Sequence, residues 1–467
     1  MNTLEDYIAH HAVHQPDKLA IVCGSDRCTY ADLNARIEAR AGQIPTPPSA
    51  PFPVPLRATP TIDFLVTYFA LHRLGLVAAP LERDMPDDTF RQVSDFMAAN
   101  TCPTGTADVL YTTGTTGRSK GVMISHRTIL ADAENLIAGQ GFSPDLTFVV
   151  NGPLNHIGSL SKVYPVMLLG ATLIIVDGLK DLDAFFSAFT SPVSPKVPEA
   201  TEATVAPEAP VPHKFATFLV PASIRILLQL APDRLAALAD RIDFIETGAA
   251  AMAQADMEAL CRLLPHSRLY NTYASTETGI ICTHNFNAAT VPDASPAAPT
   301  PGCLGRPMPH SRVFITPDGL IACVGDTLMT GYLGDPDRTA TVLRDGVLYT
   351  ADAGTIDEEG RLHLQGRKDD VINVGGFKVA PTEVEDAAMA FETVSDCICI
   401  AVDHKITGKA LKLLVALKPS ATLNKRALAL HLKSRLEAYK VPMLYEQVDS
   451  IHRTFNGKLD RKHYSTL

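Results

Sequence analysis

Helical segments and short apolar runs alternate through the first 300 residues, and this alternation constrains the fold more than any other feature of the sequence. The segment 62–75 has helical spacing of its apolar residues and ends at a glycine, and a strand is expected directly after it over 76–81. The order strand, helix, strand is expected again over 148–178 and over 242–274. Strands separated by helices form parallel sheets with helices on their faces, and ligands bind beyond the carboxyl ends of such strands.

The alternation ends near residue 300, where short strands with turn signals follow. The segment 355–367 predicts a hairpin around Glu359 and Gly360. Beyond it, strands are expected over 395–404 and 411–418, and a helix is expected within 424–439. We therefore predict an α/β fold, with a large N-terminal domain of parallel or mixed sheets covered by helices and a small C-terminal α+β domain.

A chain of 467 residues is too long for a single core. We place the N-terminal domain at 1–367 and a mobile C-terminal domain at 368–467, with the hinge at Asp369. Two Pro-rich stretches, 43–55 and 191–212, are expected to be extended surface loops without a functional signal.

Composition excludes several classes of function. A net charge of −10 argues against non-specific binding of nucleic acid, which needs a basic surface. The first 20 residues lack the long apolar core of a signal peptide, and no run has the length and apolarity of a membrane span. The nine cysteines form no CxxC pair and are interpreted as reduced thiols, so a cytoplasmic location is expected.

The stretch YTTGTTGRSKGV at 111–122 predicts a phosphate-binding loop. Glycines allow close backbone approach, successive N–H groups form an anion-binding concavity, and hydroxyls with a lysine add donors. It is not a Walker A loop, because the four-residue gap and the Gly-Lys pair are missing. A flexible polar linker is the alternative, disfavoured by a strand at 107–110 and a helix at 124–137. The donors are Thr112, Thr113, Thr115, Thr116, Ser119 and Lys120.

Two further segments follow expected strands. In NGPLNHIGSL, His156 lies where it could line a substrate pocket, although a lone histidine can equally be structural. In YNTYASTETG, Tyr273 offers a face for a base, Thr276 a donor to phosphate and Glu277 a hard oxygen ligand for Mg²⁺. A helix N-cap at Ser275 or Thr276 is the alternative interpretation of the same residues.

Three more candidates lie toward the C-terminus. Asp352 follows a strand and can accept hydrogen bonds from two ribose hydroxyls, or it is a turn residue. Arg367 is a forked donor, and Gly375-Gly376 allows close backbone approach. Lys458 stands at the tip of an Asn-Gly turn, with a frayed basic tail as the alternative.

Taken together and in this order, these stretches resemble the acyl-adenylate-forming (AMP-binding) superfamily, which includes acyl- and aryl-CoA synthetases, adenylation domains of peptide synthetases and luciferases. The matching stretches span residues 111–461. They are YTTGTTGRSKGV, PLNHIGSL, YNTYASTETG, TGYLGDP, YTAD, GRKDDVINVGGFKVAPTEVE and NGKLDR.

The resemblance implies that ATP and a carboxylic acid form acyl-AMP and pyrophosphate, and that a thiol, usually coenzyme A, then displaces AMP. It implies catalytic roles for Lys458, which bridges the carboxylate and the α-phosphate, for His156 beside the carboxylate, and for Glu277, which binds Mg²⁺. The 111–122 loop holds the β- and γ-phosphates, and Lys378 and Gly376 approach the thiol channel in a second domain orientation. The implied nucleotide and acyl contacts are Gly248, Ala249, Ala250, Asn271, Thr272, Tyr273, Ala274, Ser275, Thr276, Asp352 and Arg367.

The sequence departs from the family pattern in several places. The first subdomain is trimmed at 97–106, and Ala274 and Ala351 replace the usual glycines. No aspartate stands at 155–158 to hold a substrate ammonium, which disfavours an α-amino acid. The acceptor can be coenzyme A or the phosphopantetheine of a separate carrier protein, for which basic stretches at 405–412 and 424–435 are candidates. The alternative to an enzyme is a nucleotide-binding homologue that has lost catalysis.

Overall fold

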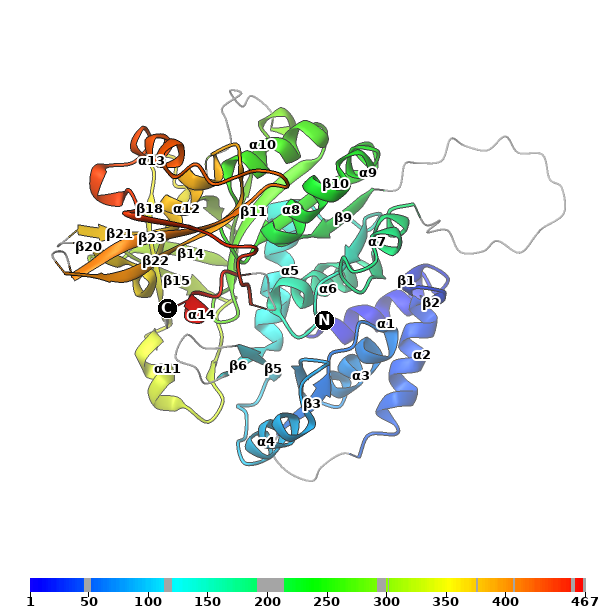
Figure 1. Cartoon of the computed structure of the whole chain (residues 1–467). Coiled ribbons are helices and arrows are strands. Elements are labelled where there is room, and N and C mark those ends of the chain that lie inside the picture. Colours follow the sequence, from blue (N-terminus) through cyan, green and yellow to red (C-terminus); the bar gives the residue numbers. More distant parts are fainter. Residues whose placement is uncertain are drawn as a thin grey trace, which may run out of the picture.

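A computed structural model gives the fold of the chain (Figure 1). It describes residues 1–45, 52–112, 120–190, 214–291, 300, 302–374, 377–405, 408–454 and 458–464, and only the backbone of Asp369, Lys378 and Lys462. The predictions for Thr113, Thr115, Thr116, Ser119 and Gly376 lie outside the described residues, as does the whole of the Pro-rich stretch 191–212. No helix within the described ranges is long and apolar enough to cross a membrane.

The N-terminal elements build a five-stranded sheet in the order β16-β6-β5-β4-β3. Its strands and the neighbouring elements are α1 (Leu4–His14), β1 (Leu19–Cys23), β2 (Asp26–Thr29), α2 (Tyr30–Ala41), β3 (Pro53–Arg57), α3 (Ile62–Arg73), β4 (Val77–Leu81), α4 (Asp87–Ala98), β5 (Thr106–Thr112), β6 (Lys120–Ser125) and β16 (Gly331–Tyr332). The prediction of a loop over 43–55 is wrong at its C-terminal end, because Pro53 and Pro55 belong to β3. This strand is at the edge of the sheet, where a proline leaves no ladder hydrogen bond unmade.

A larger sheet forms the centre of the molecule, in the order β14-β15-β18-β19-β13-β12-β11-β10-β9-β7-β8-β1-β2, with β17 beside β18. Strands β8, β7, β9, β10 and β11 run parallel, and antiparallel strands continue the sheet beyond β11. The elements are α5 (His126–Gln140), β7 (Thr147–Val150), α6 (Ile157–Leu169), β8 (Thr172–Ile175), α7 (Leu182–Ala188), β9 (Phe215–Phe218), α8 (Pro221–Leu230), α9 (Pro232–Ala236), β10 (Ile242–Gly248), α10 (Gln254–Leu263), β11 (Arg268–Ser275), β12 (Gly279–Asn285), β13 (Cys303–Pro307), β14 (Ser311–Ile315), β15 (Leu320–Gly325), α11 (Pro336–Val342), β17 (Leu343–Arg344), β18 (Val347–Ile356) and β19 (Leu362–Arg367). The α/β fold with mixed sheets is therefore confirmed.

Side-chain alternation along β10 explains why helices cover both faces of this sheet. Phe244 packs into the apolar cluster that contains α5 and α6, whereas its neighbour Ile245 packs into the cluster that contains α8 and α10. The strand is buried on both faces, as expected for the middle of a parallel sheet. The carboxyl ends of β10 and β11 thus point out of a fully covered sheet.

The residues after Arg367 form separate small sheets with their own apolar clusters (Figure 1). The elements are β20 (Ile372–Val374), β21 (Phe377–Val379), α12 (Pro381–Met389), β22 (Val394–His404), β23 (Gly408–Leu417), α13 (Lys425–Lys433), β24 (Leu444–Gln447) and α14 (Arg461–Tyr464). The helix expected within 424–439 is shorter than the segment, because Ser434 caps α13 and Glu437 is extended. Clusters on either side of Arg367 share no residue, which supports our proposal of a domain boundary there.

All nine cysteines lie in the described part of the chain and are free thiols. Seven of them are buried, and burial raises the pKa of Cys102 to about 11. The interpretation of the cysteines as reduced thiols therefore agrees with the structure.

Candidate active site

The two ends of the predicted phosphate loop lie side by side in the sheet. Thr112 is the last residue of β5, Lys120 is the first residue of β6, and the two are paired across the antiparallel ladder. The Oγ1 atom of Thr112 is buried and has no hydrogen-bond partner among the described residues. A loop between paired strand ends leaves the lysine and this hydroxyl fixed at its base.

Lys120 lies in a three-residue contact that joins distant parts of the sequence. Its Nζ atom donates to Oε1 of Glu277 at 2.7 Å and to the hydroxyl of Tyr332 at 2.9 Å. The Tyr332 hydroxyl in turn donates to the same Glu277 oxygen at 3.0 Å. Burial alone would raise the pKa of Glu277, but the Lys120 ammonium lowers it below its ordinary value, so the carboxylate is ionised at neutral pH.

The segment that carries Glu277 is a hairpin turn between β11 and β12. The alternative of a helix N-cap at Ser275 or Thr276 is wrong, because no helix begins there. Ser275 and Thr278 exchange two hydrogen bonds of 3.0 Å between backbone N–H groups and hydroxyls, which closes the turn. Gly279 then takes a φ of +67° with its Cα facing the carbonyl of Thr327, a place where a Cβ atom would clash.

The remaining residues of β11 are held by hydrogen bonds within the protein. Asn271 donates to the carbonyl of Cys303 at 3.2 Å, and the hydroxyls of Thr272 and Thr283 lie 3.0 Å apart. The Tyr273 hydroxyl donates to Oδ2 of Asp352 at 2.7 Å. These bonds fix the strand whose carboxyl end leads into the Glu277 turn.

Asp352 and Arg367 are direct neighbours in the ladder between β18 and β19. The Nε atom of Arg367 lies 3.8 Å from Oδ1 of Asp352. Neither Ala274 nor Ala351 is among the described non-glycine residues with positive φ, which are Ala249, Asp345 and Ser420. The two alanines that replace the family's glycines are therefore accommodated without left-handed backbone strain.

The end of β10 supplies the segment from Gly248 to Ala250. A Cβ atom on Gly248 would lie 2.8 Å from the carbonyl oxygen of Thr272, so this position requires glycine. Ala249 follows with a φ of 67°, an uncommon conformation for a residue other than glycine. The chain therefore turns sharply at the carboxyl end of the strand.

His156 and Lys458 reach this region from segments far apart in the sequence. His156 precedes the first turn of α6, and burial together with the positive charge of Lys458 lowers its pKa to about 4, so the imidazole is neutral. Lys458 still reaches solvent, yet burial by neighbouring atoms and repulsion from Arg367 lower its pKa, while Asp352 and Glu277 attract its charge. The structure thus brings Lys458 within electrostatic reach of His156, Glu277, Asp352 and Arg367.

The segment carrying Lys458 is fixed on both sides. Thr454 N–H donates to the Lys458 carbonyl at 2.8 Å, and Arg453 and Leu459 form a β-bridge. Arg461 donates two bonds of 2.8 Å to the carboxylate of Glu385 on α12. These anchors lie within the C-terminal elements, so Lys458 moves only with them.

Sequence reasoning missed two features of this region. The first is Tyr332, whose hydroxyl contacts Lys120 and Glu277. It lies in the stretch TGYLGDP, where a tyrosine between two glycines was the available signal. A buried ion pair joins Lys162 of α6 to Glu246 of β10 at 2.8 Å, with both side chains 1% exposed. Its signal was a single lysine inside the otherwise uncharged segment 157–169.

The chain matches the family model of AMP-binding enzymes over residues 91–333, and the model of the AMP-binding enzyme C-terminal domain over residues 383–458. The first match covers more than half of the chain. The chain belongs to the AMP-binding enzyme family.

Three curated relatives are CoA ligases of different substrates. A 3-[(3aS,4S,7aS)-7a-methyl-1,5-dioxo-octahydro-1H-inden-4-yl]propanoyl:CoA ligase of Rhodococcus jostii is 31% identical, over 80% of this chain and 68% of that protein. A feruloyl-CoA synthase of Amycolatopsis sp is 29% identical, over 76% of this chain and 69% of the relative. A long-chain-fatty-acid–CoA ligase of Bacillus subtilis is 28% identical, over 75% of this chain and 60% of that protein.

Among solved structures, ATP-bound MatB from Rhodopseudomonas palustris superposes with a TM-score of 0.82 at 22% identity, covering 98% of this chain and 99% of that one. This likeness shows the adenylating-enzyme fold. By family and relatives, this enzyme is an ATP-dependent, AMP-forming acid–thiol ligase of the acyl- and aryl-CoA synthetase type.

Proposed function

We propose that this enzyme activates a carboxylic acid without an α-ammonium group and transfers its acyl group to coenzyme A, using the residues assembled above. A carboxylate oxygen of the acid attacks the α-phosphorus of ATP, the bond to the β-phosphate oxygen breaks, and pyrophosphate leaves. The thiol sulfur of coenzyme A then attacks the acyl carbon of acyl-AMP, the bond to the AMP oxygen breaks, and the thiol proton passes to solvent.

The observation that carries this proposal is the convergence of charge from separate elements. The first step brings two anions together, and its charge must be offset by preorganised cationic donors. Lys120 from β6, Arg367 from β19 and Lys458 from the C-terminal elements supply positive charge around Glu277 and Asp352.

Within this arrangement each group has a distinct task. Lys458 binds the acid's carboxylate and the α-phosphate, and the neutral imidazole of His156 lines the carboxylate site. Asp352 and Arg367 hold the ribose hydroxyls. Lys120 and Thr112 at the base of the phosphate loop bind the β- and γ-phosphates.

Glu277 fits the role of a magnesium ligand. It is an ionised carboxylate, 17% exposed, and hard oxygen ligands of this kind bind Mg²⁺ together with substrate phosphates. A bound magnesium ion would add positive charge against the departing pyrophosphate.

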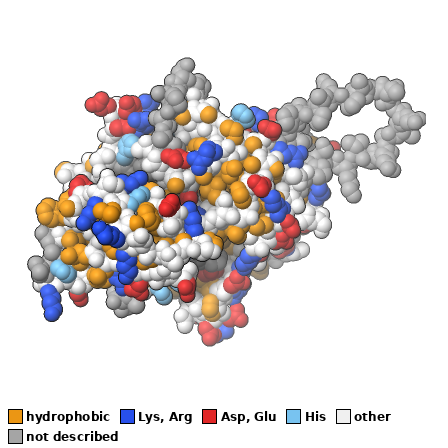
Figure 2. Space-filling model, turned by 45° about the horizontal axis from the view of Figure 1, so that its top comes forward, with side chains coloured by type: hydrophobic (Ala, Val, Ile, Leu, Met, Phe, Trp, Pro, Cys, Tyr) orange, Lys and Arg blue, Asp and Glu red, His pale blue; other side chains and the backbone are white. Residues whose placement is uncertain are grey.

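A carrier protein is the second acceptor that we consider, on the strength of the basic C-terminal stretches. Lys409 and Lys412 each form a 2.6 Å ion pair, with Asp403 and Glu446. On the face in Figure 2, Lys and Arg side chains are interspersed with acidic and hydrophobic ones. These pairings and the CoA-ligase relatives favour coenzyme A.

Product analysis tests the proposal. The enzyme is incubated with ATP, Mg²⁺ and a panel of fatty, aromatic, hydroxy and amino acids, first without thiol and then with coenzyme A or a phosphopantetheinylated carrier protein. We expect acyl-AMP from a non-amino acid and its acyl-CoA when coenzyme A is added. Acyl-AMP that is consumed by the carrier protein alone would exclude coenzyme A as the acceptor.

A further inference from the structure

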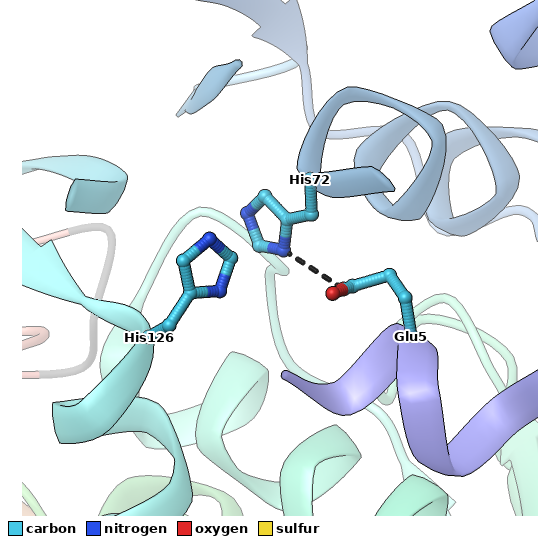
Figure 3. Close-up of side chains that lie close together, drawn as sticks. All are labelled: Glu5, His72 and His126. Carbon is cyan, nitrogen blue, oxygen red and sulfur yellow. Dashed lines mark hydrogen bonds and ion pairs between the residues drawn. The ribbon is translucent and has the colours of Figure 1, made fainter. Parts of the chain in front are cut away.

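A buried cluster of ionisable side chains lies apart from the residues assigned to catalysis. Glu5 of α1, His72 of α3 and His126 of α5 point toward one another (Figure 3). One ligand atom from each lies within 4.8 Å of the others. Glu5 and His72 are each 4% exposed, and His126 is half-buried.

His72 is held on both ring nitrogens. Its Nδ1 atom lies 3.1 Å from Oε1 of Glu5, and its Nε2 atom lies 2.9 Å from Oδ1 of Asp108 on β5. Asp108 is fully buried and also accepts a 2.8 Å bond from the Tyr68 hydroxyl. The second carboxylate oxygen of Glu5, Oε2, is buried without a partner among the described residues.

Both ring nitrogens of His72 face carboxylate oxygens, which only accept hydrogen bonds, so each nitrogen carries a proton in this arrangement. Burial alone would lower the pKa of His72, but Asp108 and Glu5 raise it to about 10, in agreement with this geometry. The Oε2 atom of Glu5 has no partner among the described residues, and an unbonded polar atom in the interior is costly.

We propose that Glu5, His72 and His126 bind a divalent metal ion, with Zn²⁺ as the ion that best fits two imidazoles and a carboxylate. His72 would bind through Nδ1 while its Nε2–H keeps the bond to Asp108, the carboxylate–histidine–zinc arrangement of known sites. The ring of His126 offers a nitrogen, and Glu5 offers its unbonded oxygen. The metal ion would take the place of the Nδ1 proton of His72.

The position of the cluster indicates a structural role. Its ligands come from three helices, one of them at the start of the chain, and Asp108 lies on β5, whose last residue begins the phosphate loop. His126 is the first residue of α5, directly after β6. A metal ion here would join α1 and α3 to the strands that flank that loop.

Zinc binding to the whole chain tests this inference in the absence of ATP and magnesium. Protein treated with a chelator is titrated with Zn²⁺ by calorimetry in two buffers of different ionisation enthalpy. We expect one tight site per chain and the release of one proton per ion, because the His72 imidazolium must give up its proton. Cobalt(II) in place of zinc should give the visible absorption of a four-coordinate site.

Variants separate this cluster from adventitious surface binding. Glu5→Gln and His126→Asn should each weaken zinc binding at least about tenfold, and Asp108→Asn should weaken it by about 10–100-fold. His14→Ala is the matched control. The rings of His10 and His14 stack on the exposed face of α1 with their centroids 3.9 Å apart, and these two residues could chelate a metal by themselves. Circular dichroism checks that each variant is folded.

Two results would overturn the inference. One is the lack of any tight zinc site in folded wild-type protein, which would leave the cluster as a buried ion triad. The other is a zinc site abolished by His14→Ala but retained in Glu5→Gln and His126→Asn.

Discussion

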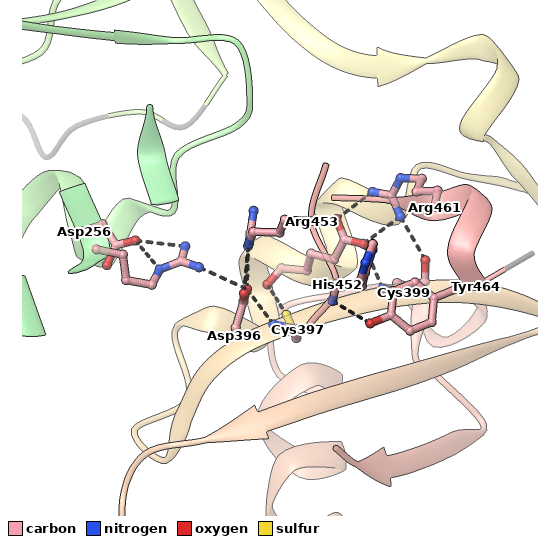
Figure 4. Close-up of polar contacts among 10 residues, drawn as sticks. Asp256, Asp396, Cys397, Cys399, His452, Arg453, Arg461 and Tyr464 are labelled. Atoms are coloured by element: carbon pink, nitrogen blue, oxygen red, sulfur yellow. Dashed lines mark hydrogen bonds and ion pairs between the residues drawn. The ribbon is translucent and has the colours of Figure 1, made fainter. Parts of the chain in front are cut away.

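Asp396 on β22 joins the C-terminal elements to the large N-terminal part, and its replacement should separate the two half-reactions. Its Oδ1 atom accepts a 3.0 Å bond from Arg225 of α8, which also pairs with Asp256 of α10 (Figure 4). Both oxygens of Asp396 also accept bonds of 2.7 and 2.8 Å from Arg453. Arg453 lies in the segment that presents Lys458, so one carboxylate couples the interdomain contact to the position of that lysine.

The free energy lost in Asp396→Asn follows from the burial of the bond between Arg225 and Asp396. Arg225 and Asp396 are 13% and 21% exposed, so their bond is neither fully screened nor fully desolvated. Hydrogen bonds to charged groups contribute about 1.5–3 kcal/mol, and exposed ion pairs about 0–1 kcal/mol. A loss of about 1.4 kcal/mol in Asp396→Asn corresponds to about a tenfold lower equilibrium constant for the orientation in which Lys458 lies in the site.

We expect Asp396→Asn to lower the rate of acyl-AMP formation by up to about tenfold and to leave thioester formation from supplied acyl-AMP unchanged or faster. Pyrophosphate exchange measures the first step, and single-turnover reaction of acyl-AMP with coenzyme A measures the second. Arg234→Ala is the matched control, because Arg234 and Asp183 form an exposed 2.8 Å pair within the large part alone. Equal loss of both half-reactions, or unchanged exchange, would refute the reasoning.

Three further predictions follow. Lys458→Ala should lower adenylation by about 10²–10³, the usual effect of losing a preorganised donor, and an unchanged exchange rate would contradict its role. Asp369→Pro, in the proposed hinge, should impair thioester formation while sparing acyl-AMP formation, as separate assays of the two steps would show. The raised pKa of His72 contributes stability that is complete below pH 6.5 and is lost as pH rises toward about 10; urea unfolding of chelator-treated protein should show this loss, and His72→Gln should lack it.

Much of the fold follows from local patterns of residues. The first strand of the order expected over 242–274 is β10 (Ile242–Gly248), and the helix expected over 62–75 is α3, because each has a clear apolar period. The Glu277 segment was ambiguous, because the same Ser and Thr residues suit a helix cap and a tight turn. Its hairpin depends on the contact of Gly279 with Thr327, which sequence spacing does not show.

Contacts between residues far apart in the sequence limited how much of the site could be predicted. The candidate residues Lys120 and Glu277 could be named from their motifs, but their direct bond joins positions 157 residues apart. The lysine within 157–169 is visible in the sequence, but its partner Glu246 is not. The partners of His72 are equally hidden, since charged residues in apolar segments gain partners only through tertiary packing.

Carboxylate-dependent ATP–pyrophosphate exchange, measured without any thiol, tests the central claim most directly. It reports the first step alone and requires the acid, ATP and magnesium in one site. We expect exchange with at least one class of non-amino acid, and about 10²–10³-fold less exchange in Lys458→Ala. Exchange that depends on an α-amino acid, or no exchange with any acid while ATP still binds, would contradict it.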